Sequence, residues 1–151
     1  MSKTVSYCAL LVVGAFLATV GVCKPGLLSD ENKFLKALVD KDFLVIAGVI
    51  LTITLASAAQ VHLALNDIES RVGRAFLHRT RASVHSDAYW LIGLFLVATI
   101  LLIMKPYFEG SEAAQAAFNA AALFILFFMI LIMASLTKLV FAIKPHFDDK
   151  E

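Results

Sequence analysis

Residues 66–87 (NDIESRVGRAFLHRTRASVHSD) separate the second and third hydrophobic blocks of the chain. Basic side chains recur in this stretch at spacings of three and four residues: Arg71, Arg74, His78, Arg81 and His85. In a helix, which turns by about 100° per residue, these positions share one face. We therefore predict a basic-faced helix over 66–87 that is joined to membrane spans and suited to a charged partner.

The composition of the whole chain indicates an integral membrane protein. Of its 151 residues, 60% are hydrophobic and 17% are charged, whereas about a quarter of the residues in soluble domains are charged. Four apolar runs approach or exceed the length that crosses a bilayer, about 20 helical residues: 5–23, 43–65, 88–104 and 113–143. We predict an all-α integral membrane protein in which residues 1–151 form a single domain of four transmembrane helices.

Residues 24–42 connect the first two spans and carry charges of both signs. Ser29 or Asp30 is placed to cap a short helix there. The apolar residues of this helix share one face: Phe34, Leu35, Leu38 and Val39. We expect the helix to lie at the membrane interface.

Positive charge is distributed unevenly between the two sides of the membrane. All four arginines lie in 66–87, on the side that also holds both chain ends. Cytoplasmic loops of membrane proteins carry an excess of lysine and arginine. The sequence therefore predicts that the N and C termini and the basic helix are cytoplasmic.

The second half of span 43–65 is small and polar. Ser57, Gln60 and His62 lie among alanines, a composition that favours close helix contacts and hydrogen bonds between helices. These three residues are our predicted pore lining. A packing histidine, a proton site and a haem ligand are alternative roles for His62, although we expect no second histidine ligand from another span.

Motifs for catalysis and metal binding do not occur in the sequence. The spans carry no carboxylate at mid-depth, and HExxH, GxSxG and glycine-rich phosphate loops are missing. Cys8 and Cys23 form no CxxC motif. We therefore expect no enzyme, no bound metal and no cofactor.

The arginine-rich stretch 66–87 suits a polyanion. The planar guanidinium group matches phosphate oxygens, and membrane topology alone requires positive charge but not arginines at helical register. The predicted ligand-binding residues are Arg71, Arg74, His78, Arg79, Arg81 and His85. Contact with anionic lipid headgroups of the bilayer is the alternative explanation.

Small residues on the first two spans favour self-association. On the first span they recur at helical spacing: Gly14, Ala15, Ala18 and Gly21. A homo-oligomer, with a tetramer as the first expectation, would gather the basic helices around one axis. Such a ring would form a receptor for a nucleotide or an oligonucleotide and could surround a pore.

This organisation of four spans, short loops and an arginine-rich 71–85 segment resembles the small four-span membrane effectors of bacterial anti-phage defence, such as the Hailong effector and the Kiwa membrane subunit. The resemblance covers the whole chain as an architecture. It implies an oligomeric channel or membrane sensor in the bacterial inner membrane. In the Hailong-like case it implies control by a nucleic-acid-type signal, which these arginines would contact: Arg71, Arg74, Arg79 and Arg81.

Other classes of protein share this sequence pattern. A holin-like pore former needs no ligand. A membrane anchor or sensor subunit would hold a cytoplasmic partner protein through residues 66–87. A haem- or quinone-binding anchor would depend on His62.

Overall fold

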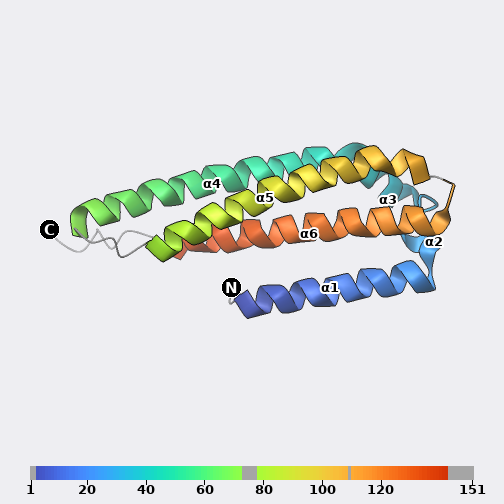
Figure 1. Cartoon of the computed structure of the whole chain (residues 1–151), viewed down its shortest axis with the longest axis horizontal. Helices are drawn as coiled ribbons and strands as arrows, with labels where there is room; N and C mark the ends of the chain where they lie inside the picture. The colour runs from blue at the N-terminus through green and yellow to red at the C-terminus, as the bar shows by residue number, and fades with distance from the viewer. Residues whose placement is uncertain (1–2, 73–77, 109, 143–151) are drawn as a thin grey trace.

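A computed structural model describes residues 3–72, 78–108 and 110–142, which form helices joined by short turns (Figure 1). In chain order these are α1 (Lys3–Cys23), α2 (Pro25–Leu28), α3 (Lys33–Ala37), the π-helical η1 (Leu38–Asp42), α4 (Phe43–Val72), α5 (His78–Met104), the 3₁₀-helical η2 (Lys105–Phe108) and α6 (Glu112–Ala142). Four of the described helices are long and apolar enough to cross a membrane. The predicted α class with four such helices is confirmed, and α4 and α5 extend beyond the predicted spans.

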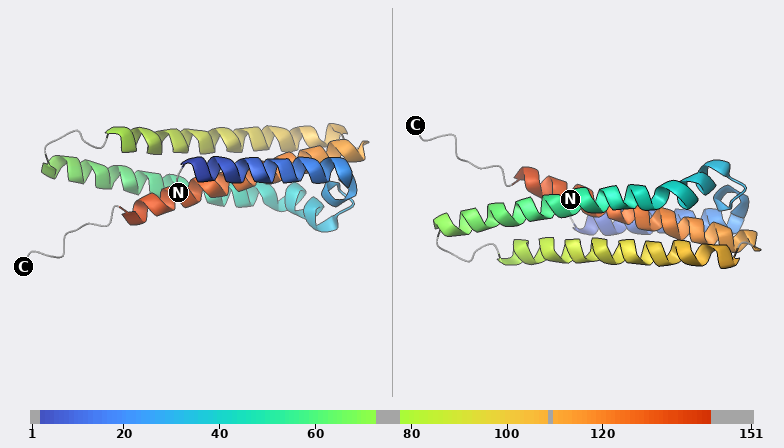
Figure 2. Two further views of the ribbon diagram at one scale, coloured as in Figure 1. Left: turned by 90° about the horizontal axis from the view of Figure 1, so that it is seen from below. Right: turned by 90° about the horizontal axis from the view of Figure 1, so that it is seen from above.

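The core lies between α4, α5 and α6 (Figure 1, Figure 2); α5 runs antiparallel to both α4 and α6, which are parallel to each other. Phe43, Leu91 and Met129, one from each helix, are completely buried there. Each helix contributes one apolar stripe to this contact. Other apolar side chains of the three helices are exposed, among them Val45, Leu96 and Ile130.

Helix α1 lies along α6 and contributes little to the core (Figure 1). Leu17 is its single buried side chain in the described part of the chain. At Gly14 the helices approach so closely that a Cβ atom would lie 3.2 Å from Cε2 of Phe124 on α6. Part of the predicted small-residue face is therefore used within the chain, whereas Ala15 and Ala18 are exposed.

The segment from α2 to η1 folds over one end of the bundle (Figure 2). Asn32 caps α3, because its Oδ1 accepts a hydrogen bond from the backbone N–H of Leu35 at 3.3 Å. The prediction that Ser29 or Asp30 provides this cap is wrong. Leu35 is buried but Phe34 is exposed, so the predicted apolar face is covered only in part.

Candidate functional site

The prediction of one basic helix over 66–87 is wrong, because the chain reverses direction within this stretch. Residues 66–72 are the last turns of α4, and residues 78–87 are the first turns of the antiparallel α5 (Figure 2). Nη2 of Arg81 lies 2.7 Å from Oε2 of Glu69, whereas twelve residues of one straight helix would separate them by about 18 Å. Residues 66–87 thus form the end of a helical hairpin, and we call this end, together with the turn of α4 that begins at His62, the α4–α5 tip.

Two of the predicted ligand-binding residues, Arg81 and His85, have described side chains. The other four lie outside the described side chains: Arg71, Arg74, His78 and Arg79. Arg81 is 30% exposed and donates hydrogen bonds to Oδ1 of Asn66 and Oε2 of Glu69. Its charge is therefore already paired with a carboxylate, which makes Arg81 less available to an external anion than the sequence predicts.

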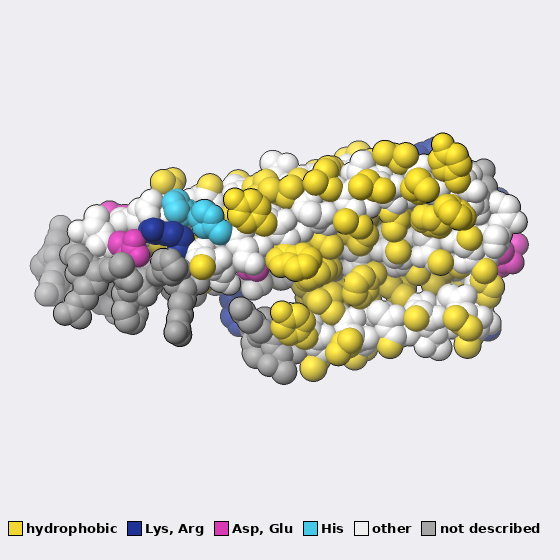
Figure 3. Space-filling model, in the orientation of Figure 1, with side chains coloured by type: hydrophobic (Ala, Val, Ile, Leu, Met, Phe, Trp, Pro, Cys, Tyr) yellow, Lys and Arg dark blue, Asp and Glu magenta, His cyan; other side chains and the backbone are white. Residues whose placement is uncertain are grey.

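His62 and His85 meet across α4 and α5. Their ring centroids are 5.3 Å apart with an interplanar angle of 72°, an edge-to-face contact. Figure 3 shows the described histidine side chains as one patch on this face of the molecule. The expectation that no facing helix offers His62 a second histidine is wrong, because α5 begins earlier than predicted and carries His85. The direct ring contact leaves no space for a porphyrin between the two histidines.

Two buried nitrogen atoms of the tip lack a hydrogen-bond partner among the described residues. Nδ1 of His62 and Nε of Arg81 are buried and unpaired in the described part of the chain. The described residues also contain no group of three or more His, Cys, Asp or Glu side chains arranged around a common metal position. The tip therefore combines a paired arginine with two neighbouring imidazoles.

The structure does not bring the three predicted pore residues together. Ser57 is half-buried and donates to the carbonyl oxygen of Ile53 at 2.9 Å. Gln60 is exposed on the outer surface of α4, and His62 faces α5. Ser57 and Gln60, three residues apart, lie on the same side of α4, whereas His62, two residues after Gln60, lies on the opposite side.

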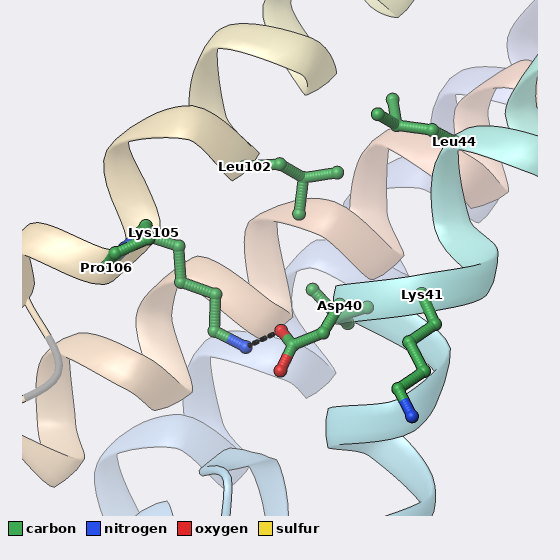
Figure 4. A pocket seen from close by; sticks show the side chains of 7 residues that line it. Asp40, Lys41, Leu44, Leu102, Lys105 and Pro106 are labelled. Carbon is green, nitrogen blue, oxygen red and sulfur yellow. Dashed lines mark hydrogen bonds and ion pairs between the residues drawn. The ribbon is translucent and has the colours of Figure 1, made fainter.

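A second charged site, which the sequence analysis missed, lies at the other end of the bundle. Lys105 directly follows α5 and is 5% exposed. Its Nζ bonds to Oδ1 of Asp40 at 2.6 Å and to Oδ1 of Asp30 at 2.9 Å; Figure 4 shows the bond to Asp40. Asn119 of α6 donates to the same oxygen of Asp30 at 3.1 Å. We call these four side chains the Lys105 cluster.

The Lys105 cluster fastens the segment from α2 to η1 onto the ends of α5 and α6. Nδ2 of Asn119 also donates to the carbonyl oxygen of Leu28 at 2.8 Å, which ties the end of α2 to α6. Burying an ammonium group is unfavourable unless charged partners compensate, and Asp30 and Asp40 supply this compensation. A cavity of about 300 Å³ opens beside Asp40 and Lys105 (Figure 4).

One feature of the sequence indicates that Lys105 needs a charged partner. Lys105 follows an uncharged run of 17 residues and precedes Pro106, so its ammonium group lies next to the apolar core and requires a counter-charge. Asp30 and Asp40 occur in residues 24–42, which connect the first two apolar runs. Local periodicity does not show which acidic residue reaches the lysine.

Comparisons with protein-family models, with curated proteins and with solved structures found no match.

Proposed function

We propose that this chain is the subunit of a homo-oligomeric membrane effector, an ion channel or pore that a nucleotide or nucleic-acid-type ligand gates at the α4–α5 tip. Its setting is the bacterial inner membrane and its role is anti-phage defence. Four long apolar helices support the membrane location. The concentration of all arginines at the α4–α5 tip supports a cytoplasmic position for this tip and for both termini.

The exposure of the polar Gln60 side chain is the observation that supports self-association. Gln60 lies on α4 beside Ala56 and Ala59, at about 9 Å along the helix from the middle of span 43–65. Its amide group has no hydrogen-bond partner in the described part of the chain, and an unpaired polar group in hydrocarbon costs several kcal/mol. The small neighbours let α4 of a second copy approach closely enough for an amide–amide bond.

The α4–α5 tip supplies the ligand site in this proposal. Helix α4 carries the exposed Gln60 and, at its C-terminal end, the first half of the tip. Oligomerisation through α4 therefore gathers the tips around one axis, where several arginines share one polyanion. Ligand binding at the tips therefore acts on the same α4 helices that contact each other in the membrane.

The ion pair between Arg81 and Glu69 makes a direct test of this ligand site possible. Glu69→Gln frees the Arg81 guanidinium from its carboxylate and leaves the hydrogen bond to Asn66 in place. One additional unpaired arginine is worth about 1 kcal/mol toward an anionic surface. We expect the affinity for a labelled short oligonucleotide, measured by fluorescence anisotropy, to rise about fivefold.

Glu31→Gln is the matched control for this experiment. It removes the same charge from an exposed position at the other end of the bundle, and we expect no change in oligonucleotide affinity. Equal effects of the two substitutions would show that overall charge, and not the α4–α5 tip, determines binding.

A further inference from the structure

A cavity of about 490 Å³ lies between α1, α5 and α6, toward the end of the bundle at which α1 begins. It forms because α1 packs on α6, while α5 lies on the opposite side of the space. The space-filling view shows the molecule hollowed between α1 and the helices above it (Figure 3). The cavity is separate from the α4–α5 ion pair and from the Lys105 cluster.

Four serines from three helices line this cavity: Ser6 of α1, Ser83 and Ser86 of α5, and Ser135 of α6. Hydroxyl groups on the long helices commonly bond back to the carbonyl oxygen four residues earlier, as they do at Thr19, Thr52 and Thr54. The four cavity serines make no such bond in the described part of the chain. Their hydroxyls are therefore free to bond to a ligand in the cavity.

The cavity lining changes from polar to apolar in one direction. The same order, polar near the membrane boundary and apolar deeper, occurs on each helix: Ser6 and Leu10 on α1, Ser86 and Trp90 on α5, and Ser135 and Leu131 on α6. The rings of Trp90 and Phe128 lie 6.4 Å apart at the apolar end. Tryptophan is enriched near the lipid headgroups, and Ser86 lies one helical turn, about 6 Å, further toward the beginning of α5 than Trp90, so the serines lie at the headgroup level.

We propose that this cavity binds one phospholipid of the surrounding leaflet. The serine hydroxyls donate hydrogen bonds to the phosphate and ester oxygens, and an acyl chain lies against Leu10, Trp90 and Leu131. The volume falls within the range of ligand pockets, about 300 to 1,000 Å³. Asp87 also lines the polar end.

Trp90 provides the measurement, because it is the single tryptophan of the chain and lines the cavity. Phosphatidylethanolamine with brominated acyl chains is titrated into the full-length protein in detergent micelles. We expect saturable quenching of Trp90 fluorescence at one lipid per chain. Native mass spectrometry should independently detect one retained lipid per chain.

A pair of double variants tests the serine contacts. Ser83→Ala with Ser135→Ala should weaken lipid binding about tenfold through the loss of two neutral hydrogen bonds. Alanine favours a helix more than serine does, so these variants retain the fold. The control, Ser57→Ala with Ser70→Ala, removes two hydroxyls that bond to backbone carbonyls of their own helix, and lipid binding should not change.

Three results would overturn this inference. Quenching that increases linearly without saturation, or equally in both double variants, shows only general contact with lipid. Complete absence of quenching shows that another group, such as a helix of a second copy, fills the cavity. None of these results depends on the nucleotide ligand proposed for the α4–α5 tip.

Discussion

Lys105→Met is expected to lower the free energy of unfolding by about 3 kcal/mol. Removing one partner of a buried ion pair costs about 3–5 kcal/mol, because the remaining charge stays buried without compensation. Here two carboxylates remain, on Asp30 with a side chain that is 12% exposed and on Asp40 with one that is 34% exposed. Solvent screens the second carboxylate in part, so we expect a value at the lower end of this range.

Thermal unfolding in detergent, followed by circular dichroism, measures this effect. Lys41→Met is the matched control, because Lys41 lines the same cavity but points away from Asp40 and Lys105 (Figure 4). Adding Asp30→Asn and Asp40→Asn to Lys105→Met should recover much of the stability, since neutral groups are less costly to bury. Equal stability of the Lys105→Met and Lys41→Met proteins would contradict the role assigned to the Lys105 cluster.

Neutralising the three arginines that accompany Arg81 is expected to weaken oligonucleotide binding about 100-fold. Each arginine near an anionic surface contributes about 1 kcal/mol, and about 3 kcal/mol corresponds to a factor of about 100 or more. The substitutions are Arg71→Gln, Arg74→Gln and Arg79→Gln. Arg81 is left unchanged because Glu69 already pairs with it.

The salt dependence of binding distinguishes phosphate contacts from other effects of these substitutions. For single-stranded nucleic acid, each neutralised phosphate contributes about −0.7 to the slope of log K against log salt concentration. The triple variant should therefore have a slope shallower by about 2. Replacing the exposed Lys24, Lys33 and Lys41 by glutamine removes the same charge at the other end of the bundle and should leave affinity and slope unchanged. If the arginine variant binds as tightly as the unmodified protein, the α4–α5 tip is not the ligand site.

The number and class of the long helices could be predicted from the sequence because hydrophobic length determines them directly. Each apolar run exceeds or approaches the thickness of a bilayer, and the described part of each lies within one long helix. The ends of α4 and α5 could not be predicted in the same way. Helical turns of polar residues continue beyond the apolar runs, as far as Val72 on α4 and from His78 on α5.

Helical periodicity also concealed the reversal between α4 and α5. Arg71 belongs to one helix and Arg81 to the next, yet the regular spacing of basic residues continues across both. Such spacing shows that each part suits a helix, but it carries no information about a turn between two helices. The contact between Arg81 and Glu69 reveals the reversal. Because this is a tertiary contact, local spacing in the sequence does not predict it.

The Lys105 cluster was missed for a related reason. The charges of residues 24–42 cancel when they are summed, which predicts a solvated surface segment. Burial of Asp30 depends on how α2 folds against α6 through the bond of Asn119 to Leu28. No local sequence pattern specifies that contact between residues so far apart in the chain.

The native mass of the protein in mild detergent, measured together with its content of bound nucleic acid, tests the proposed function most directly. We predict a closed homo-oligomer, with a tetramer as the expected size, that carries nucleotide or oligonucleotide released by high salt. Gln60→Leu should shift this oligomer toward smaller species, since it removes the amide that copies of α4 share. A ligand-free monomer in the unmodified protein would contradict both self-association and polyanion binding, and would favour a membrane anchor that acts through a partner protein.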